Sequence, residues 1–498
     1  MTPQLLFNQA VSLHQQGRLA DAEPLYLQLL AAAPDVFQGH YLFAILRFQQ
    51  QRSAEALRAL ETALKINPDA PEALNLHGVL LQAGGRREEA LASFTRAFAL
   101  KPDFAEASYN KGIALAELKR HAEAVLAFDQ ALALAPNAEV FNSRGSTLRT
   151  LKRFGPALES FDAALALAPD HVEALTNRAS LLLRLARFDE AAPDLGRALA
   201  LRPDDPGALA MHGRLLCETG RVAEGFAVLR RHAELVHGAD PGTRDGDPEH
   251  KRTHDAEQRA HLAAQGVTPG FHLGDGARLA GAAISPANAQ DIDAQWLSNK
   301  PQLVVIDNLL TPQALEKLQR YCRDSTIWRD AYKNGYLGAM PEYGLAAPLL
   351  AQIADELRQT FPAVFGDHQL QLLWGFKYDG SLGGVGIHAD QAAVNVNIWI
   401  TPDEANTNPD NGGLIVWDAS APLDWEFSQY NGCNDDAVRD FLAKAGAKAT
   451  VVPYRANRAV IFDSDLFHET DNIEFRPGYE NRRIGITLLY GRRSASGN

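Results

Sequence analysis

Two short segments of this chain carry side chains of the types that bind divalent metal ions. His388 and Asp390 lie two residues apart in GIHADQ, and in a β-strand residues i and i+2 point to the same face. One imidazole and one carboxylate supply two of the three ligands of a facial triad, which leaves other metal positions open. His468, in RAVIFDSDLFHETD and 80 residues after His388, becomes the third ligand if an antiparallel strand returns it to the pair. A His-x-Asp pair alone is common by chance, so the case for a metal site depends on the sequence motifs around it.

A basic pair follows the third candidate ligand. Fourteen residues after His468 the predicted strand RRIGITLLYG begins, and its Arg482 or Arg483 could place a guanidinium inside a β-barrel. A buried Arg without a counter-ion raises the free energy of the native state, so such a residue requires an anion. The parallel N–H groups of a guanidinium match the two oxygens of a carboxylate. Strand alternation separates two faces: Arg483, Gly485 and Thr487 on one, and Ile484, Ile486 and Leu488 on the other. The polar face suits an anion, which favours Arg483 over Arg482.

The order His-x-Asp, distal His, then Arg on a late strand resembles the 2-oxoglutarate-dependent oxygenase superfamily. The resemblance is closest to its prolyl-hydroxylase-like branch, where a tyrosine and a Gly-rich turn precede the His-x-Asp pair. Here YDGSLGGVGIHAD places Tyr378 ten residues before His388, and RIGIT repeats the branch's arginine strand with Thr487. The resemblance covers about residues 300 to 493 and implies a double-stranded β-helix, a jelly-roll barrel with supporting helices.

The resemblance also implies a chemistry. His388, Asp390 and His468 would bind Fe(II), and 2-oxoglutarate would chelate the metal while Arg483 and Tyr378 hold its far carboxylate. With O2 the products would be succinate, carbon dioxide and an oxidised substrate, as in a hydroxylase. The alternative is a cupin-like barrel that binds another divalent metal or has lost catalysis. A zinc hydrolase is disfavoured because no HExxH base accompanies the ligands.

The last two hundred residues predict a mixed domain that is mostly β. QLVVIDNLL (302–310) reads as a buried strand, and Thr311 as the N-cap of a helix that Pro312 begins. A second helix is expected over 346–360. Short runs of β-formers follow Phe361 and indicate a sandwich or barrel: QLLWGFKY, AVNVNIWIT, GLIVWD, ATVVPY, RAVIFD and RIGITLLYG.

The first half of the chain repeats with a fixed period. Prolines recur at intervals of 34, 34, 34, 33 and 34 residues, from Pro34 through Pro68, Pro102, Pro136 and Pro169 to Pro203. Each unit has a small residue, an alanine twelve positions later and a large apolar residue four beyond, as in Gly112, Ala124 and Phe128. This pattern resembles the tetratricopeptide repeat family over about residues 3 to 205, with a degraded seventh unit to 237. It predicts an all-α superhelix of about six and a half repeats, in which each proline ends a helix.

Such arrays bind a protein or peptide in their groove. The resemblance thus favours a hydroxylase whose array recruits a polypeptide substrate. The alternatives are a small-molecule oxygenase of natural-product or amino-acid metabolism whose array mediates assembly, and a scaffold with a vestigial barrel. The array could also serve only as a spacer or in self-association, so a homo-oligomer is compatible with it.

Between the two parts the sequence predicts a linking segment, so the expected domains are 1–237, 238–300 and 301–498. GADPGTRDGDP (238–248) is dense in Gly, Pro and Asp, which indicates a break in regular structure. The histidines nearby match no closed zinc pattern and read as solvated: His232, His237, His250, His254, His261 and His272.

Bulk properties exclude other classes of function. The 498 residues carry a net charge of -13, which opposes binding to a phosphate backbone, so nucleic acid is not an expected partner. No apolar run reaches the ~20 residues of a membrane span, and the start of the chain does not read as a secretory signal. Three dispersed cysteines, Cys217, Cys322 and Cys433, form neither a disulfide framework nor a zinc site, which fits a reducing cytoplasm.

The segment between Asp390 and His468 departs from the family pattern. It contains DEANTNPDNGGLIVWD and ASAPLDWEFSQYNGCNDD, and we expect this insertion to shape the substrate opening. Asn397 is expected to pack within a sheet more than to touch a cosubstrate. A group of further residues is expected to serve turns, solvent or a tight strand entry: Asp463, Asp465, Glu469, Gly412 and Gly413.

Overall fold

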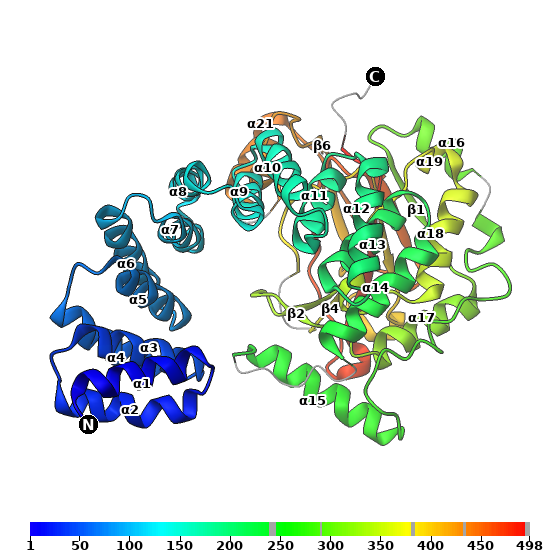
Figure 1. The fold of residues 1–498 in the computed structure, drawn as a ribbon. Helices are drawn as coiled ribbons and strands as arrows, with labels where there is room; N and C mark the ends of the chain where they lie inside the picture. The colour runs from blue at the N-terminus through cyan, green and yellow to red at the C-terminus, as the bar shows by residue number, and fades with distance from the viewer. Residues whose placement is uncertain (239–245, 289–290, 380–383, 432–434, 494–498) are drawn as a thin grey trace. The chain divides into compact units, whose positions relative to one another are not determined.

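The computed structural model describes residues 1–238, 246–288, 291–379, 384–431 and 435–493 (Figure 1). The chain folds into two compact units, Met1–Leu201 and Arg202–Asn498. The first unit is entirely helical. The second combines helices with antiparallel sheets, and all the candidate metal ligands lie in it.

The first unit consists of consecutive antiparallel helix pairs. In chain order they are α1 (Pro3–Gln15) and α2 (Leu19–Ala32), α3 (Phe37–Gln49) and α4 (Ser53–Ile66), α5 (Pro71–Ala83) and α6 (Arg87–Leu100), α7 (Ala105–Glu117) and α8 (His121–Leu134), α9 (Ala138–Thr150) and α10 (Phe154–Leu167), and α11 (Val172–Arg184) and α12 (Phe188–Leu201). Each second helix ends two residues before its recurring proline, as α8 does at Leu134 before Pro136. The prediction that the prolines end these helices is confirmed.

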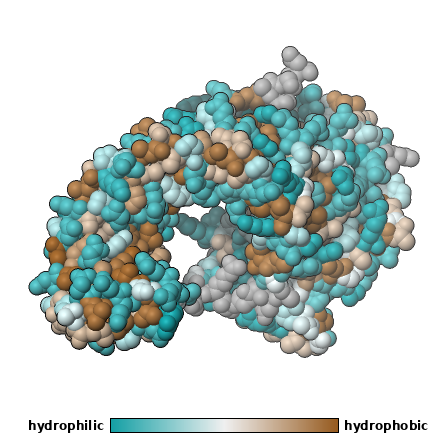
Figure 2. Space-filling model, in the orientation of Figure 1, coloured by the Kyte–Doolittle hydropathy of each residue, from teal (hydrophilic) through white to brown (hydrophobic). Residues whose placement is uncertain are grey.

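The small residues of the repeat lie where two helices of a pair touch. A Cβ built on Gly112 of α7 would lie 2.5 Å from Cε1 of Phe128 on α8, and Gly78 and Phe94 show the same relation. Phe128 and Phe94 are fully buried. The repeat-forming contacts therefore lie inside the pairs, while the face of the molecule seen in Figure 2 shows hydrophobic residues interspersed among hydrophilic ones.

The helix contact gives a test with a matched control in the same unit. We expect Gly112→Ala to lower the free energy of unfolding by roughly 1 to 3 kcal/mol, because its methyl group meets the buried Phe128 ring. Gly196→Ala, in mid-helix of α12 with no atom within 4 Å of the added Cβ, should raise it by about 0.5 to 1 kcal/mol. Urea unfolding followed by far-ultraviolet circular dichroism measures both. Equal effects of the two changes would contradict the predicted contact.

The last helix pair belongs to the second unit. α13 (Pro206–Glu218) and α14 (Val222–His237) continue the repeat pattern, yet α14 packs on α18 (Pro348–Thr360). Phe226 and Leu229 of α14 share one apolar cluster with Leu357, and Arg492 forms an ion pair with the buried Glu218. The sequence boundary at 237 marks the end of the repeat pattern, whereas the compact units divide at Leu201.

The described residues of 246–300, expected as part of a linking segment, lie within the second compact unit. The described part of this segment forms α15 (Glu249–Ala264), the short helix η1 (Pro286–Asn288) and α16 (Ile292–Ser298). Ile292 and Trp296 enter the main apolar cluster. The carboxylate of Glu356 on α18 accepts hydrogen bonds from the backbone N–H groups of Ala283 and Ile284. Residues 239–245 of the Gly/Pro/Asp-rich stretch lie outside the described residues.

Two of the histidines expected to be solvated are covered instead. His254 has no exposed surface, and its Nδ1 lies 3.0 Å from Oδ1 of Asp255. Burial, with the charges of Lys377 and Arg482, holds the pKa of His254 well below its usual range. The His261 side chain is 10% exposed and pairs with Asp324. The prediction was wrong for these two residues because α15 is anchored: the side-chain amide of Gln258 donates to the backbone carbonyls of Arg323 and Ser325.

The second unit contains two antiparallel sheets. The larger has the order β1-β8-β5-β10-β4-β3-β2 and the smaller the order β7-β6-β9. The strands are β1 (Leu303–Ile306), β2 (Asp330–Ala331), β3 (Tyr336–Ala339), β4 (Leu370–Tyr378), β5 (Val394–Trp399), β6 (Leu414–Ser420), β7 (Ala449–Val452), β8 (Ala459–Asp463), β9 (Leu466–Thr470) and β10 (Arg483–Tyr490). The predicted β-rich region is confirmed. Closure into a jelly-roll barrel is not, because the hydrogen-bonded ladders form two separate sheets.

The larger sheet has two faces of different character. Helices α17 (Pro312–Asp324) and α18 cover one face, where Ile484, Ile486 and Leu488 of β10 are buried with them. The opposite face of β10 carries Arg483, Gly485 and Thr487 into a cavity. The predicted alternation along β10 is therefore confirmed, as is the Thr311 cap of α17, whose side chain accepts a hydrogen bond from the Ala314 N–H.

Lys377 on β4 lies on the covered face of the sheet. Its ammonium group is 3.9 Å from the ring centre of Tyr479 and 5.4 Å from that of Trp328, and it has no hydrogen-bond partner among the described residues. Burial holds the pKa of Lys377 well below its usual value of 10.5, and the charge of Arg482 adds to this. The unfolded chain therefore binds a proton at neutral pH that the native state disfavours, so Lys377 lowers stability there.

The difference in the pKa of Lys377 between the native and the unfolded state predicts that removal of its amine stabilises the protein, by an amount that depends on pH. We expect Lys377→Met to raise the free energy of unfolding at pH 7 by roughly 1 to 3 kcal/mol. The gain should shrink as the pH rises toward about 10.4, where the lysine of the unfolded chain is neutral too. Urea unfolding at pH 7 and pH 9.5 measures the difference, with the exposed Lys444→Met as the control. A loss of stability at pH 7 would overturn this account of Lys377.

Candidate metal centre

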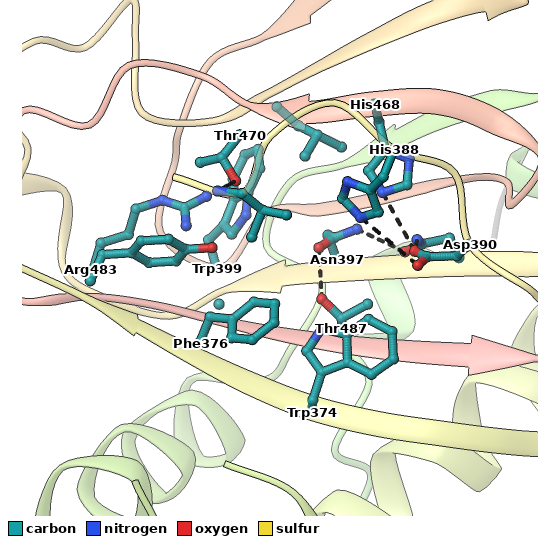
Figure 3. Close-up of a pocket in the computed structure, with 15 residues that line it drawn as sticks. Trp374, Phe376, His388, Asp390, Asn397, Trp399, His468, Thr470, Arg483 and Thr487 are labelled. Atoms are coloured by element: carbon teal, nitrogen blue, oxygen red, sulfur yellow. Dashed lines mark hydrogen bonds and ion pairs between the residues drawn. The ribbon is translucent and has the colours of Figure 1, made fainter. Parts of the chain in front are cut away.

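His388, Asp390 and His468 converge at one end of the cavity (Figure 3). One ligand atom from each residue lies within 4.8 Å of the others. His388 Nε2 is 3.8 Å from Asp390 Oδ1, and His468 Nε2 is 3.4 Å from Asp390 Oδ2. The side chains of Asp390 and His468 are 6% and 4% exposed, whereas that of His388 is 15% exposed. The centre is thus more open on the side of His388.

Backbone hydrogen bonds hold the three residues in this arrangement. The His388 N–H donates to the His468 carbonyl at 2.9 Å, and the His468 N–H donates back at 2.8 Å. The Asp390 N–H donates to the Ser464 carbonyl. His468 lies on β9, and the expected antiparallel return is present, but GIHADQ is not the regular strand that we predicted. His388 forms a single isolated bridge, and residues 389–393 are irregular.

The part of the insertion that follows β6 explains why His388 and Asp390 do not lie on a regular strand. Between His388 and Asp390, the Ala389 N–H donates to the Tyr430 carbonyl, and the Asn431 side chain donates to the Ala389 carbonyl. Tyr430 ends α20 (Phe427–Tyr430), which precedes α21 (Asp435–Ala445). The insertion therefore satisfies the backbone that a strand neighbour would otherwise pair. Residues 432–434, including Cys433, lie outside the described residues; the other two cysteines are buried free thiols.

The two imidazoles present the same nitrogen to the centre. His388 Nδ1 lies 2.8 Å from the Gly386 carbonyl, and His468 Nδ1 lies 3.0 Å from the Leu466 carbonyl. A carbonyl only accepts, so each Nδ1 carries a proton, and it is Nε2 of each ring that faces the centre and holds the lone pair of the neutral form. Burial lowers the pKa of His388 to about 4, with a further contribution from His468. A neutral imidazole of this tautomer is a metal ligand.

Asp390 remains a carboxylate in this buried position. Burial acts to raise its pKa, but the facing His468 and His388 and a hydrogen bond from Asn395 outweigh burial and hold the pKa below its usual value. The Asn395 amide donates to Asp390 Oδ2 at 2.6 Å. An anionic oxygen and two neutral imidazoles form a donor set that fits a divalent transition metal.

Arg483 lies at the other end of the same cavity (Figure 3). It is 3% exposed, and its Nε donates to the Gly412 carbonyl at 2.7 Å. Burial lowers its pKa, while hydrogen bonding to the Tyr378 hydroxyl acts in the opposite direction. Within the described residues no carboxylate forms an ion pair with Arg483, and this leaves a buried cation beside open space.

Tyr378 stands beside Arg483 on the neighbouring strand. The two residues are register partners of β4 and β10, and the guanidinium lies 4.9 Å from the tyrosine ring centre. Burial raises the pKa of Tyr378, and its hydroxyl forms hydrogen bonds with Thr470 and Arg483. Tyr378 therefore stays protonated and can donate to an anion. The Gly-rich turn at 380–383 that follows it lies outside the described residues.

Arg482 points to the other side of the sheet. Its guanidinium pairs with Glu257 of α15 at 2.9 Å and with Asp379 at 3.4 Å. These carboxylates compensate the charge of Arg482, and Arg482 does not line the cavity. Of the two candidate arginines, the geometry leaves Arg483 as the one that faces the metal ligands.

The cavity extends between these two ends of the site. Sequence reasoning missed part of its wall: Trp374, Phe376, Val385, Leu414 and Thr470. Alternation along β4 could have found two of these, because Trp374 and Phe376 precede Tyr378 at steps of two. Asn397 was expected to pack within the sheet, but it lines the cavity.

The remaining residues near the centre have structural partners. Asp465 pairs with Arg493 and Glu469 with Arg439. A Cβ on Gly413 would lie 1.9 Å from the Val452 carbonyl oxygen, so only glycine fits where β6 begins. The interpretation of Gly413 as a tight strand entry is confirmed.

The comparisons with known proteins identify the helical region. Tetratricopeptide repeat models match residues 13–80, 75–139, 143–206 and 176–242. The chain therefore contains tetratricopeptide repeats across this region, as predicted. No curated protein matches the chain, and no helix within the described residues is long and apolar enough to cross a membrane.

Solved structures similar to this chain include several repeat proteins. PilF of Pseudomonas aeruginosa is 20% identical, with 42% of this chain and 96% of that chain covered and a TM-score of 0.38. A tetratricopeptide repeat protein from Parabacteroides merdae is 16% identical, covering 47% and 93%, with a TM-score of 0.40. YrrB, a repeat protein with an unusual peptide-binding site, is 22% identical, covering 36% and 93%, with a TM-score of 0.32.

Proposed function

We propose that this chain, whose first half consists of tetratricopeptide repeats, is an Fe(II)- and 2-oxoglutarate-dependent oxygenase. The observation that carries the proposal is the pairing of two features in one cavity. A His, Asp, His donor set lies at one end, and the buried Arg483, without a carboxylate partner among the described residues, lies at the other. One dicarboxylate that chelates a metal explains both features.

His388, Asp390 and His468 fit Fe(II) as ligands. Both Nε2 atoms are free because each Nδ1 is engaged with a carbonyl group. Two imidazoles and one carboxylate leave metal positions open for a cosubstrate and O2. On this proposal the two sheets are the halves of a double-stranded β-helix whose interior holds the cofactor.

Arg483, Tyr378 and Thr470 fit the far carboxylate of 2-oxoglutarate. The guanidinium supplies charge and parallel N–H donors, and the tyrosine hydroxyl lies beside it. When bound, iron and 2-oxoglutarate supply oxidative decarboxylation to succinate and carbon dioxide, coupled to oxidation of a substrate. The protein would orient both groups, and Trp374 and Phe376 line the space between them.

Substitution of the two adjacent arginines tests the cosubstrate site. We expect Arg483→Leu to weaken 2-oxoglutarate binding to the Fe(II)-loaded protein roughly 30-fold or more, since the buried carboxylate loses its charged partner. Arg482→Leu is the matched control, because Arg482 pairs with Glu257 outside the cavity. Anaerobic titration, followed by the visible charge-transfer band of the iron and 2-oxoglutarate complex, measures both. His388→Ala provides the blank without a metal ligand.

The outcome separates the alternatives. Absence of the charge-transfer band in the wild-type protein at high concentrations of Fe(II) and 2-oxoglutarate would refute the oxygenase proposal. The domain would then be a barrel that binds another metal or has lost catalysis. Equal binding by both arginine variants would assign the cosubstrate to another residue.

For the substrate we favour a protein or peptide that the repeat array recruits in a reducing cytoplasm. Tetratricopeptide repeats generally bind protein or peptide partners, and their helix pairs form extended surfaces suited to a polypeptide. The alternative is a small-molecule oxygenase whose array binds partner enzymes.

Removal of residues 1–201 discriminates these two substrates. The cut follows the compact units, because α13 and α14 are part of the core of the second unit. If the array recruits the substrate, 2-oxoglutarate turnover without substrate should stay unchanged, while stimulation by a peptide fraction of cell lysate should be lost. Succinate release measures both, and circular dichroism checks folding. Full stimulation of the truncated protein would refute recruitment by the array.

A further inference from the structure

We infer that a directed chain of side-chain hydrogen bonds, from Thr487 through Asn397 and Asn395, holds Asp390 as a metal ligand through one oxygen only. The inference rests on the proposed metal centre and adds three positioning residues to it. Figure 3 shows the chain running from the wall of the cavity to the carboxylate.

The chain crosses the two central strands of the larger sheet. The Thr487 hydroxyl on β10 donates to Asn397 Oδ1 on β5 at 2.8 Å, and these residues are register partners. Asn397 Nδ2 donates to Asn395 Oδ1 at 2.7 Å, and Asn395 Nδ2 donates to Asp390 Oδ2 at 2.6 Å. Asn395 has no exposed surface, so water does not compete for its amide.

The direction of the chain follows from its charged end. A carboxylate only accepts hydrogen bonds, so Asn395 must turn its NH2 group toward Asp390. The side-chain carbonyl of Asn395 then faces Asn397 and requires a donor. Asn397 must therefore turn its NH2 group toward Asn395 and its own side-chain carbonyl toward Thr487. The last acceptor, Asn397 Oδ1, requires the Thr487 hydroxyl as donor. Each member is oriented by the next.

The chain occupies one carboxylate oxygen. Asp390 Oδ2 accepts the short bond from Asn395 and lies 3.4 Å from His468 Nε2, whereas Oδ1 lies 3.8 Å from His388 Nε2 and accepts only a long, 3.4 Å contact from the Asn431 amide, so Oδ1 has the more available lone pairs. A metal between the three ligands would therefore meet Oδ1. Ligation of a bound metal by one oxygen would leave more of its positions open than ligation by both oxygens. The chain thus keeps room for a cosubstrate that chelates.

The test uses the full chain loaded with Co(II), whose visible absorption weakens as its coordination number rises. Thr487→Val removes the first donor without changing shape, and Thr487→Ser retains it. We expect Thr487→Val to weaken the Co(II) absorption and to weaken 2-oxoglutarate binding about 2- to 10-fold, while Thr487→Ser matches the wild type. Thr487 does not touch Asp390, so an effect on the metal must travel along the chain.

A second variant separates the chain from direct contact with a ligand. In Asn395→Leu the chain is cut at Asp390, and Thr487→Val added to it should cause no further change. Asn397→Leu cuts the chain midway and replaces Asn395→Leu in this cycle if that variant does not fold. Identical Co(II) spectra for Thr487→Val and Thr487→Ser, or additive effects in the double variant, would overturn the inference. A wild-type protein that binds neither Co(II) nor 2-oxoglutarate would instead refute the proposed function.

Discussion

The mutual backbone hydrogen bonds between His388 and His468 are the interaction on which the candidate centre depends. They join a segment outside any strand to β9 of the smaller sheet, and so bring together ligands that are 80 residues apart in the chain. Hydrogen bonds on either side, from the Asp390 N–H to the Ser464 carbonyl and from the Thr470 N–H to the Val385 carbonyl, join the same two segments. The Nδ1 contacts with Gly386 and Leu466 then orient each ring, because both acceptors are carbonyls two residues before their histidine. The peptide backbone thus determines the tautomer as well as the position.

A second constraint is that the cavity is polar inside a folded core. Arg483, Asp390 and Asn395 are all nearly fully buried, and each buried polar group must find a partner or raise the free energy of the native state. β10 meets this constraint by alternation. Its cavity face carries Arg483 and Thr487, and its other face packs under helices. Lys377 is the exception, because it places an amine on the apolar side of β4, where it lies over aromatic rings and has no hydrogen-bond partner among the described residues.

The parts of this structure that were predictable from sequence are those whose signal is local. The repeat is one, since Gly112 and Phe128 recur with a fixed period and each pair of helices makes its own contacts. The side of the sheet to which Arg483 points is another, because alternation along a strand can be predicted without knowing which strands lie beside it. The burial of His254 was not predictable, because it depends on Gln258 bonding to Ser325, 67 residues away. For the same reason the helical pattern could not reveal that Phe226 belongs to the core of the second unit.

The insertion after β6 shows how one segment can serve both support and selectivity. It was expected only to shape an opening, yet Tyr430 and Asn431 hold the peptide of Ala389, the residue between two ligands. Arg493 packs over the Tyr430 ring at 4.6 Å and pairs with Asp465, so the insertion is tied to the end of β10 and to the β8–β9 turn. Because the same residues support the ligands, a change of this segment that alters the opening also acts on Asp390. The ligand geometry and the shape of the opening are therefore coupled through two residues rather than set independently.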